Sequence, residues 1–266
     1  AKLAELFHHA GVVVSHGFLA SLLAPAPAVG DEDGFFTDAH AVEQAGLASS
    51  PWQHLDATGT RVDGEHWHCH VLGNSLFTAY HTTPTKDRLA VLDVLQGCPG
   101  ERRYQLNTAA DAYLDQVGLS PTARGRLADW PRDCDLDEAA VTELLAAQRL
   151  VLGPQQQTRI REALALGAAH AREDWPRIST LVCDDAAAFR LVTEDLALCW
   201  VHEGRHYKKL FAYLDTHRRL LDGIRDQFWT YYRELRTYRE HPTPAERTRL
   251  TTRFEALFGQ VTGFRL

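Results

Sequence analysis

Residues 52–83 alternate between apolar and polar side chains, and this stretch limits the fold more than any other part of the chain. A period of two places successive side chains on opposite faces of a β-strand. Asp63-Gly64 and Gly73-Asn74 interrupt the alternation, and both pairs are typical of tight turns. The sequence therefore predicts three antiparallel strands, over residues 53–62, 65–72 and 76–83.

The rest of the chain has mainly helical patterns, interrupted by two short apolar runs at residues 178–183 and 196–200. Short apolar runs without alternation are typical of buried parallel strands. A helix is predicted over residues 87–95, a helical link over 186–193, and helices over 205–214 and 218–239. This order of elements predicts an α/β fold with a ribonuclease-H-like mixed sheet, in which three antiparallel strands and two parallel strands are joined by large helical insertions.

The same order divides the chain into five expected segments. They are an N-terminal helical segment (1–50), the first half of the core (51–97), a helical insertion (98–177), the second half of the core (178–215) and a helical arm (216–266). In the first segment, the spacing of Leu3, Leu6 and Phe7 predicts a helix that ends at Gly11. Ser15 is expected to cap a second helix.

Composition limits the compartment and the class of protein that are expected. No apolar run approaches the roughly 20 residues that span a bilayer, so no membrane segment is expected. The five cysteines are scattered without a CxxC pair, which favours reduced thiols and a cytoplasmic protein. The net charge is −7, yet basic residues outnumber acidic ones from residue 199 to the end. The absence of Met favours a fragment of a longer product.

Two acidic residues stand where the predicted sheet would bring them together. Asp56 lies within the first strand, and Asp184 follows the apolar run 178–183. An acid in an apolar strand is costly unless a metal ion or hydrogen bonds compensate its charge. Two-metal phosphodiester chemistry uses carboxylates that converge on divalent cations, and Mg²⁺ prefers such hard oxygen ligands. The pair therefore predicts a site for Mg²⁺ or Mn²⁺.

Three motifs resemble those of DDE transposases of bacterial insertion sequences of the IS-sixty-six type. Asp56-Ala-Thr-Gly-Thr-Arg-Val62 is similar to their first-acid motif, and Asp184, with Phe189 five residues later, is similar to their second. Residues 199–207, Cys-Trp-Val-His-Glu-Gly-Arg-His-Tyr, resemble their CWxHxxRxF block. The resemblance is strongest over residues 52–83 and 178–214. It implies DNA strand cleavage and strand transfer with transposon ends and target DNA, in a homo-oligomeric complex.

The departures from the family pattern concern the acids. Ala57 replaces a Glu, Asp185 replaces a Gly and is a further candidate metal ligand, and Gly204 replaces an Arg. The family's third acid lies in an Asn-Asn-x-x-Glu-Arg motif, which does not occur in these 266 residues. Either that acid lies beyond the end of the sequence, or Glu203 supplies it. The expected catalytic set is then Asp56, Asp184 and Glu203.

The residues expected to contact DNA follow the second acid. His202, Arg205, Lys208 and Lys209 are candidates for phosphate contacts, and His202 could instead order the acids. Two other functions stay open. One is an inactive transposase remnant that binds DNA or a protein partner, and the other is a zinc-dependent hydrolase that uses the alternating histidines His66, His68 and His70.

Overall fold

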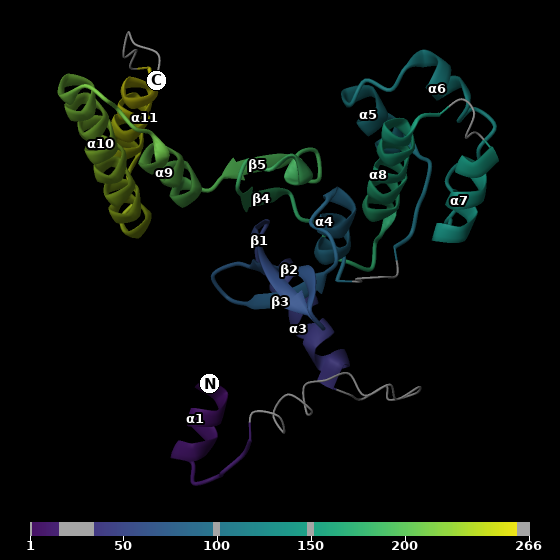
Figure 1. The fold of residues 1–266 in the computed structure, drawn as a ribbon, viewed down its shortest axis with the longest axis horizontal. Coiled ribbons are helices and arrows are strands. Elements are labelled where there is room, and N and C mark those ends of the chain that lie inside the picture. The colour runs from purple at the N-terminus through teal and green to yellow at the C-terminus, as the bar shows by residue number, and fades with distance from the viewer. Residues whose placement is uncertain (1, 16–34, 98–101, 148–151, 260–266) are drawn as a thin grey trace. The chain divides into compact units, whose positions relative to one another are not determined.

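A computed structural model describes residues 2–15, 35–97, 102–147 and 152–259 (Figure 1). The chain divides into two compact units, residues 1–45 and 46–266. The first contains α1 (Lys2–His9) and most of α3 (Phe35–Ala48), and α1 confirms the helix predicted before Gly11. The helix predicted after Ser15 falls outside the described residues. The four segments predicted from residue 51 onward all lie in the second unit.

The second unit contains a five-stranded sheet with the order β3-β2-β1-β4-β5. β1 (Trp52–Val62), β2 (Glu65–Gly73) and β3 (Thr78–Thr83) are antiparallel neighbours, as the alternation predicts. Asp63 and Gly64 have φ values of 49° and 84°, the left-handed backbone that an Asp-Gly hairpin turn requires. β4 (Thr180–Cys183) pairs with β1 in parallel, and β5 (Asp195–Leu198) pairs with β4 in parallel. The mixed α/β sheet of three antiparallel and two parallel strands is therefore confirmed.

The segment between β3 and β4 is helical over most of its length. It contains α4 (Arg88–Leu95), α5 (Thr108–Gln116), α6 (Pro121–Gly125), α7 (Glu138–Ala147) and α8 (Pro154–Ala171). The side chains of Asp87, Asn107 and Ser120 accept hydrogen bonds from the first turns of α4, α5 and α6. Residues 126–137 contain no α-helix, although the sequence predicts helix throughout. Asp133 has a φ of 54°, and Tyr104 and Leu136 form an isolated β-bridge there.

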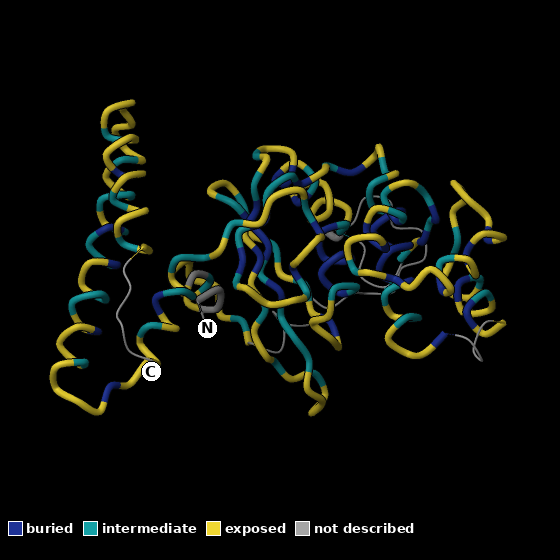
Figure 2. The backbone as a smooth tube through the Cα atoms, turned by 90° about the horizontal axis from the view of Figure 1, so that it is seen from above, coloured by how far each residue is buried: buried dark blue, intermediate teal, exposed yellow. Residues whose placement is uncertain are grey.

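The core of this unit joins the sheet to the helical segment. Leu55 and Leu181 are buried on β1 and β4, and they belong to the same cluster as Val91 of α4 and Leu164 of α8. α4 contacts both β2 and α8, and α8 packs on α5. Figure 2 shows dark blue, buried backbone in the strands and in these helices. The helical segment therefore shares its hydrophobic core with the sheet that holds the two acids.

The chain after β4 differs from the prediction in three places. The link predicted as a helix over 186–193 contains only a short 3-10 turn, η1 (Ala187–Phe189), and the strand predicted to reach residue 200 ends at Leu198. α9 (Trp200–Lys209) begins five residues earlier than predicted and leaves residues 210–214 outside any helix. Trp200 stacks on Phe228 of α10 (Asp215–Glu240), so packing fixes the start of α9.

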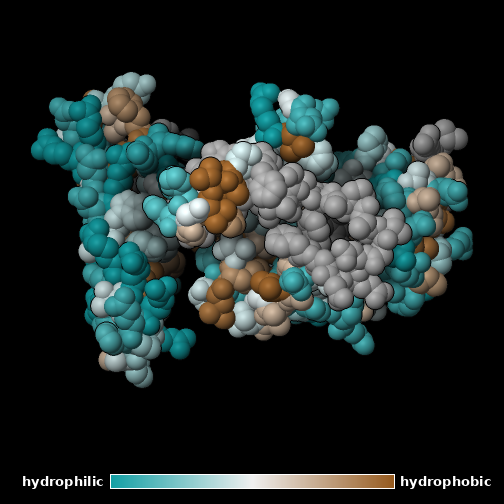
Figure 3. All heavy atoms as spheres, turned by 90° about the horizontal axis from the view of Figure 1, so that it is seen from below, coloured by the Kyte–Doolittle hydropathy of each residue, from teal (hydrophilic) through white to brown (hydrophobic). Residues whose placement is uncertain are grey.

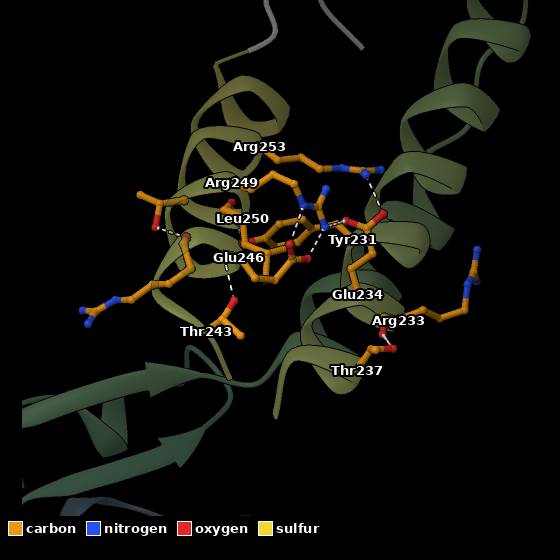
Figure 4. Close-up of polar contacts among 11 residues, drawn as sticks. Tyr231, Arg233, Glu234, Thr237, Thr243, Glu246, Arg249, Leu250 and Arg253 are labelled. Carbon is orange, nitrogen blue, oxygen red and sulfur yellow. Dashed lines mark hydrogen bonds and ion pairs between the residues drawn. The ribbon is translucent and has the colours of Figure 1, made fainter. Parts of the chain in front are cut away.

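α10 and α11 (Pro244–Phe258) pack on each other, and their contacts combine buried and charged groups (Figure 4). The buried Tyr231 hydroxyl donates to the Leu250 carbonyl at 3.1 Å. Glu234 accepts from Arg249 and Arg253 across the interface. In the face of the molecule that Figure 3 shows, the described hydrophobic residues form small, separate patches among hydrophilic ones. Among the described residues, no helix has both the length and the apolarity that membrane crossing requires.

Candidate functional site

The candidate site lies where β1 and β4 run side by side. Trp52, Gln53 and His54 pair in parallel with Thr180, Leu181 and Val182. Asp56 lies two residues beyond the last paired residue of β1, and Asp184 lies two residues beyond that of β4, just after the strand ends; the same register continued this far would bring the two level. Neighbouring strands lie about 4.8 Å apart, and side chains at matching positions share a face. The intervening residues, Leu55 and Cys183, are both buried on the opposite face. The expected meeting of the two acids on adjacent strands is therefore consistent with the register of the sheet.

The Asp56 carboxylate is 60% exposed and has one oxygen turned toward another element. Its Oδ1 accepts the backbone N–H of Ala57 at 2.9 Å. Its Oδ2 lies 4.0 Å from Nε2 of His202, which α9 carries on its first turn. His202 is largely buried, and its Nδ1 has no hydrogen-bond partner among the described residues. His202 thus faces the first acid, which favours the ordering role considered for it.

Asp184 occupies the turn that leaves β4. Its Oδ1 accepts the backbone N–H of Ala186 at 2.9 Å, a local bond that is common where Asp begins a turn. Burial, and then the negative charge of Asp184, raise the pKa of the neighbouring Cys183 thiol to about 12. One carboxylate oxygen of the second acid is therefore hydrogen-bonded to the backbone of the turn that it begins.

Asp185 and Glu203 have partners of their own. The Asp185 carboxylate forms a 2.7 Å ion pair with Arg190, across the η1 turn. Glu203 lies 3.7 Å from His206 on the same helix. It also contacts Tyr207, whose pKa is raised by burial and then by this carboxylate. In the part of the chain that the structure describes, no group of three or more His, Cys, Asp or Glu side chains could hold a metal ion. The structure therefore does not assemble Glu203 or Asp185 with Asp56 and Asp184 into a three-ligand site.

The alternating histidines of β2 do not form a three-ligand group either, within the described residues. His66 and His68 contact each other, with ring centroids 4.8 Å apart. His70 is fully buried and hydrogen-bonds through Nε2 to the Thr83 hydroxyl at 2.8 Å. Burial lowers the pKa of both His68 and His70. These contacts are those of sheet residues and do not support the zinc site.

α9 separates its side chains into a packed face and a basic face. Trp200, Gly204 and Tyr207 pack against the aromatic residues of α10, and the small Gly204 allows the ring of Trp229 to approach. Arg205, Lys208 and Lys209, which we name the α9 basic face, are exposed and have no carboxylate partner among the described residues. The i, i+3, i+4 spacing places them on one side of the helix. Three uncompensated cations on one face suit a phosphate backbone.

Arg88 is a partly buried residue that the sequence pattern did not single out. Its guanidinium forms a 2.6 Å ion pair with Glu162 of α8 and donates to the carbonyls of Ala187 and Arg190, at 2.6 and 3.0 Å. The only local signal was an Arg at the start of the otherwise apolar helix α4. That signal is weak, because an Arg in a first helical turn is usually solvated.

Comparison with known proteins gives a relative whose name states no activity. No family model matches the chain, and no solved structure matches it. An uncharacterized protein of Sinorhizobium fredii, y4jO, is 30% identical over 220 residues, which cover 83% of this chain and 67% of the relative. The chain therefore belongs to the same family as this Sinorhizobium fredii protein.

Proposed function

We propose that the protein is a divalent-metal-dependent enzyme that cleaves and joins DNA strands, a DDE-type transposase with a ribonuclease-H-like core. The observation that carries the proposal is the parallel pairing of β1 with β4, which ends at His54 and Val182, two residues before Asp56 and Asp184. The order of the strands and the similarity of residues 56–62, 184–189 and 199–207 to the transposase motifs support the same conclusion.

The donor set suits Mg²⁺ or Mn²⁺. Asp56 and Asp184 each use Oδ1 for a backbone N–H, which leaves Oδ2 as a hard oxygen donor on β1 and on the turn after β4. A divalent ion bound there supplies charge stabilisation and a more acidic water at the scissile phosphodiester. His202 limits the positions open to the Asp56 carboxylate, because its Nε2 lies 4.0 Å from Oδ2. The α9 basic face, on the same helix as His202, holds the phosphate backbone.

The proposal also assigns the setting in which the protein acts. Its partners are DNA, as transposon ends and target, and further copies of the same chain in the active complex. Its compartment is the cytoplasm, which fits the free thiols of the described cysteines Cys69, Cys134, Cys183 and Cys199.

The test is whether substitution of either acid reduces both metal binding and DNA cleavage. Asp56→Asn and Asp184→Asn each remove the ionised oxygen donors but keep the side-chain shape. We expect Mn²⁺ affinity, measured by electron paramagnetic resonance, to fall at least about tenfold. Nicking of DNA that carries the element ends should fall below detection. Glu194→Gln is the matched control, because that carboxylate pairs with Arg177 outside the turn that follows β4. Undiminished cleavage by Asp56→Asn contradicts the proposal.

A second function, DNA binding without cleavage, is favoured by a specific observation. Among the described residues no three acids or other ligands converge on one metal position, while α9 carries a basic face. A binding module would retain duplex DNA in a gel-shift assay with or without Mn²⁺, and Asp56→Asn would leave that binding unchanged. Metal-dependent nicking by the wild-type protein excludes this alternative.

A further inference from the structure

The guanidinium of Arg88 connects the helical segment to the turn that follows the second acid. On one side it donates to Glu162 of α8 at 2.6 Å and to the Tyr113 hydroxyl of α5 at 2.7 Å. On the other side it donates to the carbonyls of Ala187 and Arg190. These partners lie 25 to 102 residues away in sequence. A single side chain thus links α4, α5, α8 and η1.

On the side of the helical segment the link is largely buried, whereas the bonds to the two carbonyls are exposed. The side chains of Arg88 and Glu162 are 14% and 11% exposed. Tyr113 is buried and donates its hydroxyl hydrogen to the same Glu162 oxygen at 2.6 Å. Removing one partner of a buried ion pair leaves the other charge without compensation. The planar guanidinium can donate in several directions at once, which a lysine ammonium on a flexible stem does not reproduce.

The turn that Arg88 holds is the one that orients Asp184. The Ala186 N–H donates to Asp184 Oδ1, and Ala187 is the next residue. Arg190, whose carbonyl accepts from Arg88 Nε, carries the side chain that pairs with Asp185. A displacement of η1 would therefore move the backbone donor that fixes the Asp184 carboxylate.

We propose that the helical segment between β3 and β4 controls the geometry of the acid pair through Arg88. Arg88 is a positioning residue: it touches neither acid and acts through the carbonyls of Ala187 and Arg190. A partner that engaged α5 or α8 and displaced Glu162 would loosen the turn and weaken metal binding. The metal-binding part of this inference rests on the proposed function, whereas the coupling between Arg88 and the turn does not.

The same part of the structure offers a matched control. Arg102 forms a bidentate pair with the buried Asp93 and donates to the Tyr104 hydroxyl, so it also combines an Arg, a carboxylate and a Tyr. None of these contacts involves residues 184–190. Arg102→Met and Arg88→Met therefore remove similar buried ion pairs, and only the second releases η1.

The primary measurement is hydrogen exchange of the peptide amides over residues 184–191. We expect exchange there to become faster in Arg88→Met and in Glu162→Gln, and to stay at the wild-type rate in Arg102→Met. Mn²⁺ affinity should fall about 10- to 100-fold in Arg88→Met, as it does when a residue that orients a metal ligand is lost. Arg88→Lys should lie between Arg88→Met and the wild type in both measurements.

The outcomes separate the two proposals. Equal exchange rates in Arg88→Met and the wild type overturn the coupling, and so does an acceleration of the same size in Arg102→Met. If the wild-type protein does not bind Mn²⁺, the proposed function fails, and the exchange measurement still decides whether Arg88 holds the turn. Should Arg88→Met fail to fold, Glu162→Gln and Arg88→Lys carry the same comparison.

Discussion

His70 shows how one side chain can make the stability of the protein depend on pH. Its Nε2 contacts the Thr83 hydroxyl, which gives its own hydrogen to the Thr85 carbonyl at 2.5 Å. Nε2 must therefore carry the hydrogen and donate. The buried Nδ1 has no partner in the described residues, so a second proton would place a charge where no acceptor receives it. Burial, followed by His68 and His81, lowers the pKa of His70, while the Thr85 carbonyl and Asp87 oppose that change.

The pH dependence follows from the direction of this shift. Below the unfolded pKa of about 6.5, the unfolded chain binds a proton that the native His70 does not, so the free energy of unfolding falls as the pH falls. The contribution is fully present above pH 6.5 and decreases by at most about 1.4 kcal/mol per pH unit. Urea denaturation between pH 7.5 and 5 measures it. In His70→Gln the decrease should be smaller, and an unchanged slope contradicts this assignment.

The sequence predicted the candidate residues only where neighbouring residues in the chain marked them. Asp56 and Asp184 stand out because they interrupt or follow apolar strands, and motif similarity added His202. Arg88 gave no comparable signal, since Glu162, Ala187 and Arg190 are 74 to 102 residues away. The pairing of Asp185 with Arg190 is closer, yet it depends on the short η1 turn where a longer helical link was predicted.

At the scale of elements, α9 depends on a glycine for its contact with α10. A Cβ at Gly204 would overlap the ring of Trp229 and lie 3.1 Å from Phe228. Trp200 and Tyr207 hold the same two helices together, with ring centroids 4.4 and 5.1 Å from that of Phe228. The transposase motif that residues 199–207 resemble has an Arg at this position. The close packing of Gly204 against Trp229 explains why this chain does not accommodate one.

Gly204→Ala should therefore destabilise the protein although alanine favours helices. Intrinsic propensity contributes about 1 kcal/mol in favour of alanine, and overpacking costs about 1–3 kcal/mol. We expect a net loss in the free energy of unfolding and a change in tryptophan fluorescence. Gly223→Ala, on α10, is the control, because nothing lies within 4 Å of the added methyl group. That variant should be as stable as the wild type or more so. Equal effects of the two substitutions would refute the packing argument.

Elements with regular periodicity were predictable, and their ends were less so. The alternation over residues 52–83 and the Asp63-Gly64 turn specified three strands, because both signals act over a few residues. The start of α9 at Trp200 depends on Phe228, nearly thirty positions later, and sequence periodicity does not contain that contact. Within residues 126–137, Leu136 likewise bridges to Tyr104, a contact that sequence periodicity does not contain.

At the scale of the whole molecule, the sign of the local charge on α9 differs from the sign of the net charge. The chain carries −7 overall, while the exposed α9 basic face is free of carboxylate partners in the described residues. Most other arginines in the second unit pair with acids, including Arg103 with Asp135, Arg177 with Glu194 and Arg218 with Asp215. A paired arginine gains less from a phosphate, because its partner must first be displaced. The α9 basic face should thus contribute more to a contact with DNA than these paired arginines do.

The salt dependence of DNA binding tests this distribution directly. Each phosphate contact contributes about 0.9 to the slope of log affinity against log salt concentration. Combining Arg205→Ala, Lys208→Ala and Lys209→Ala should therefore reduce the magnitude of the slope by about 2–3. Combining Arg103→Ala, Arg177→Ala and Arg218→Ala changes the net charge equally but removes cations that are already paired. If fluorescence anisotropy at several salt concentrations gives the same slope for both triple variants, net charge governs binding, and the α9 basic face is not the contact surface.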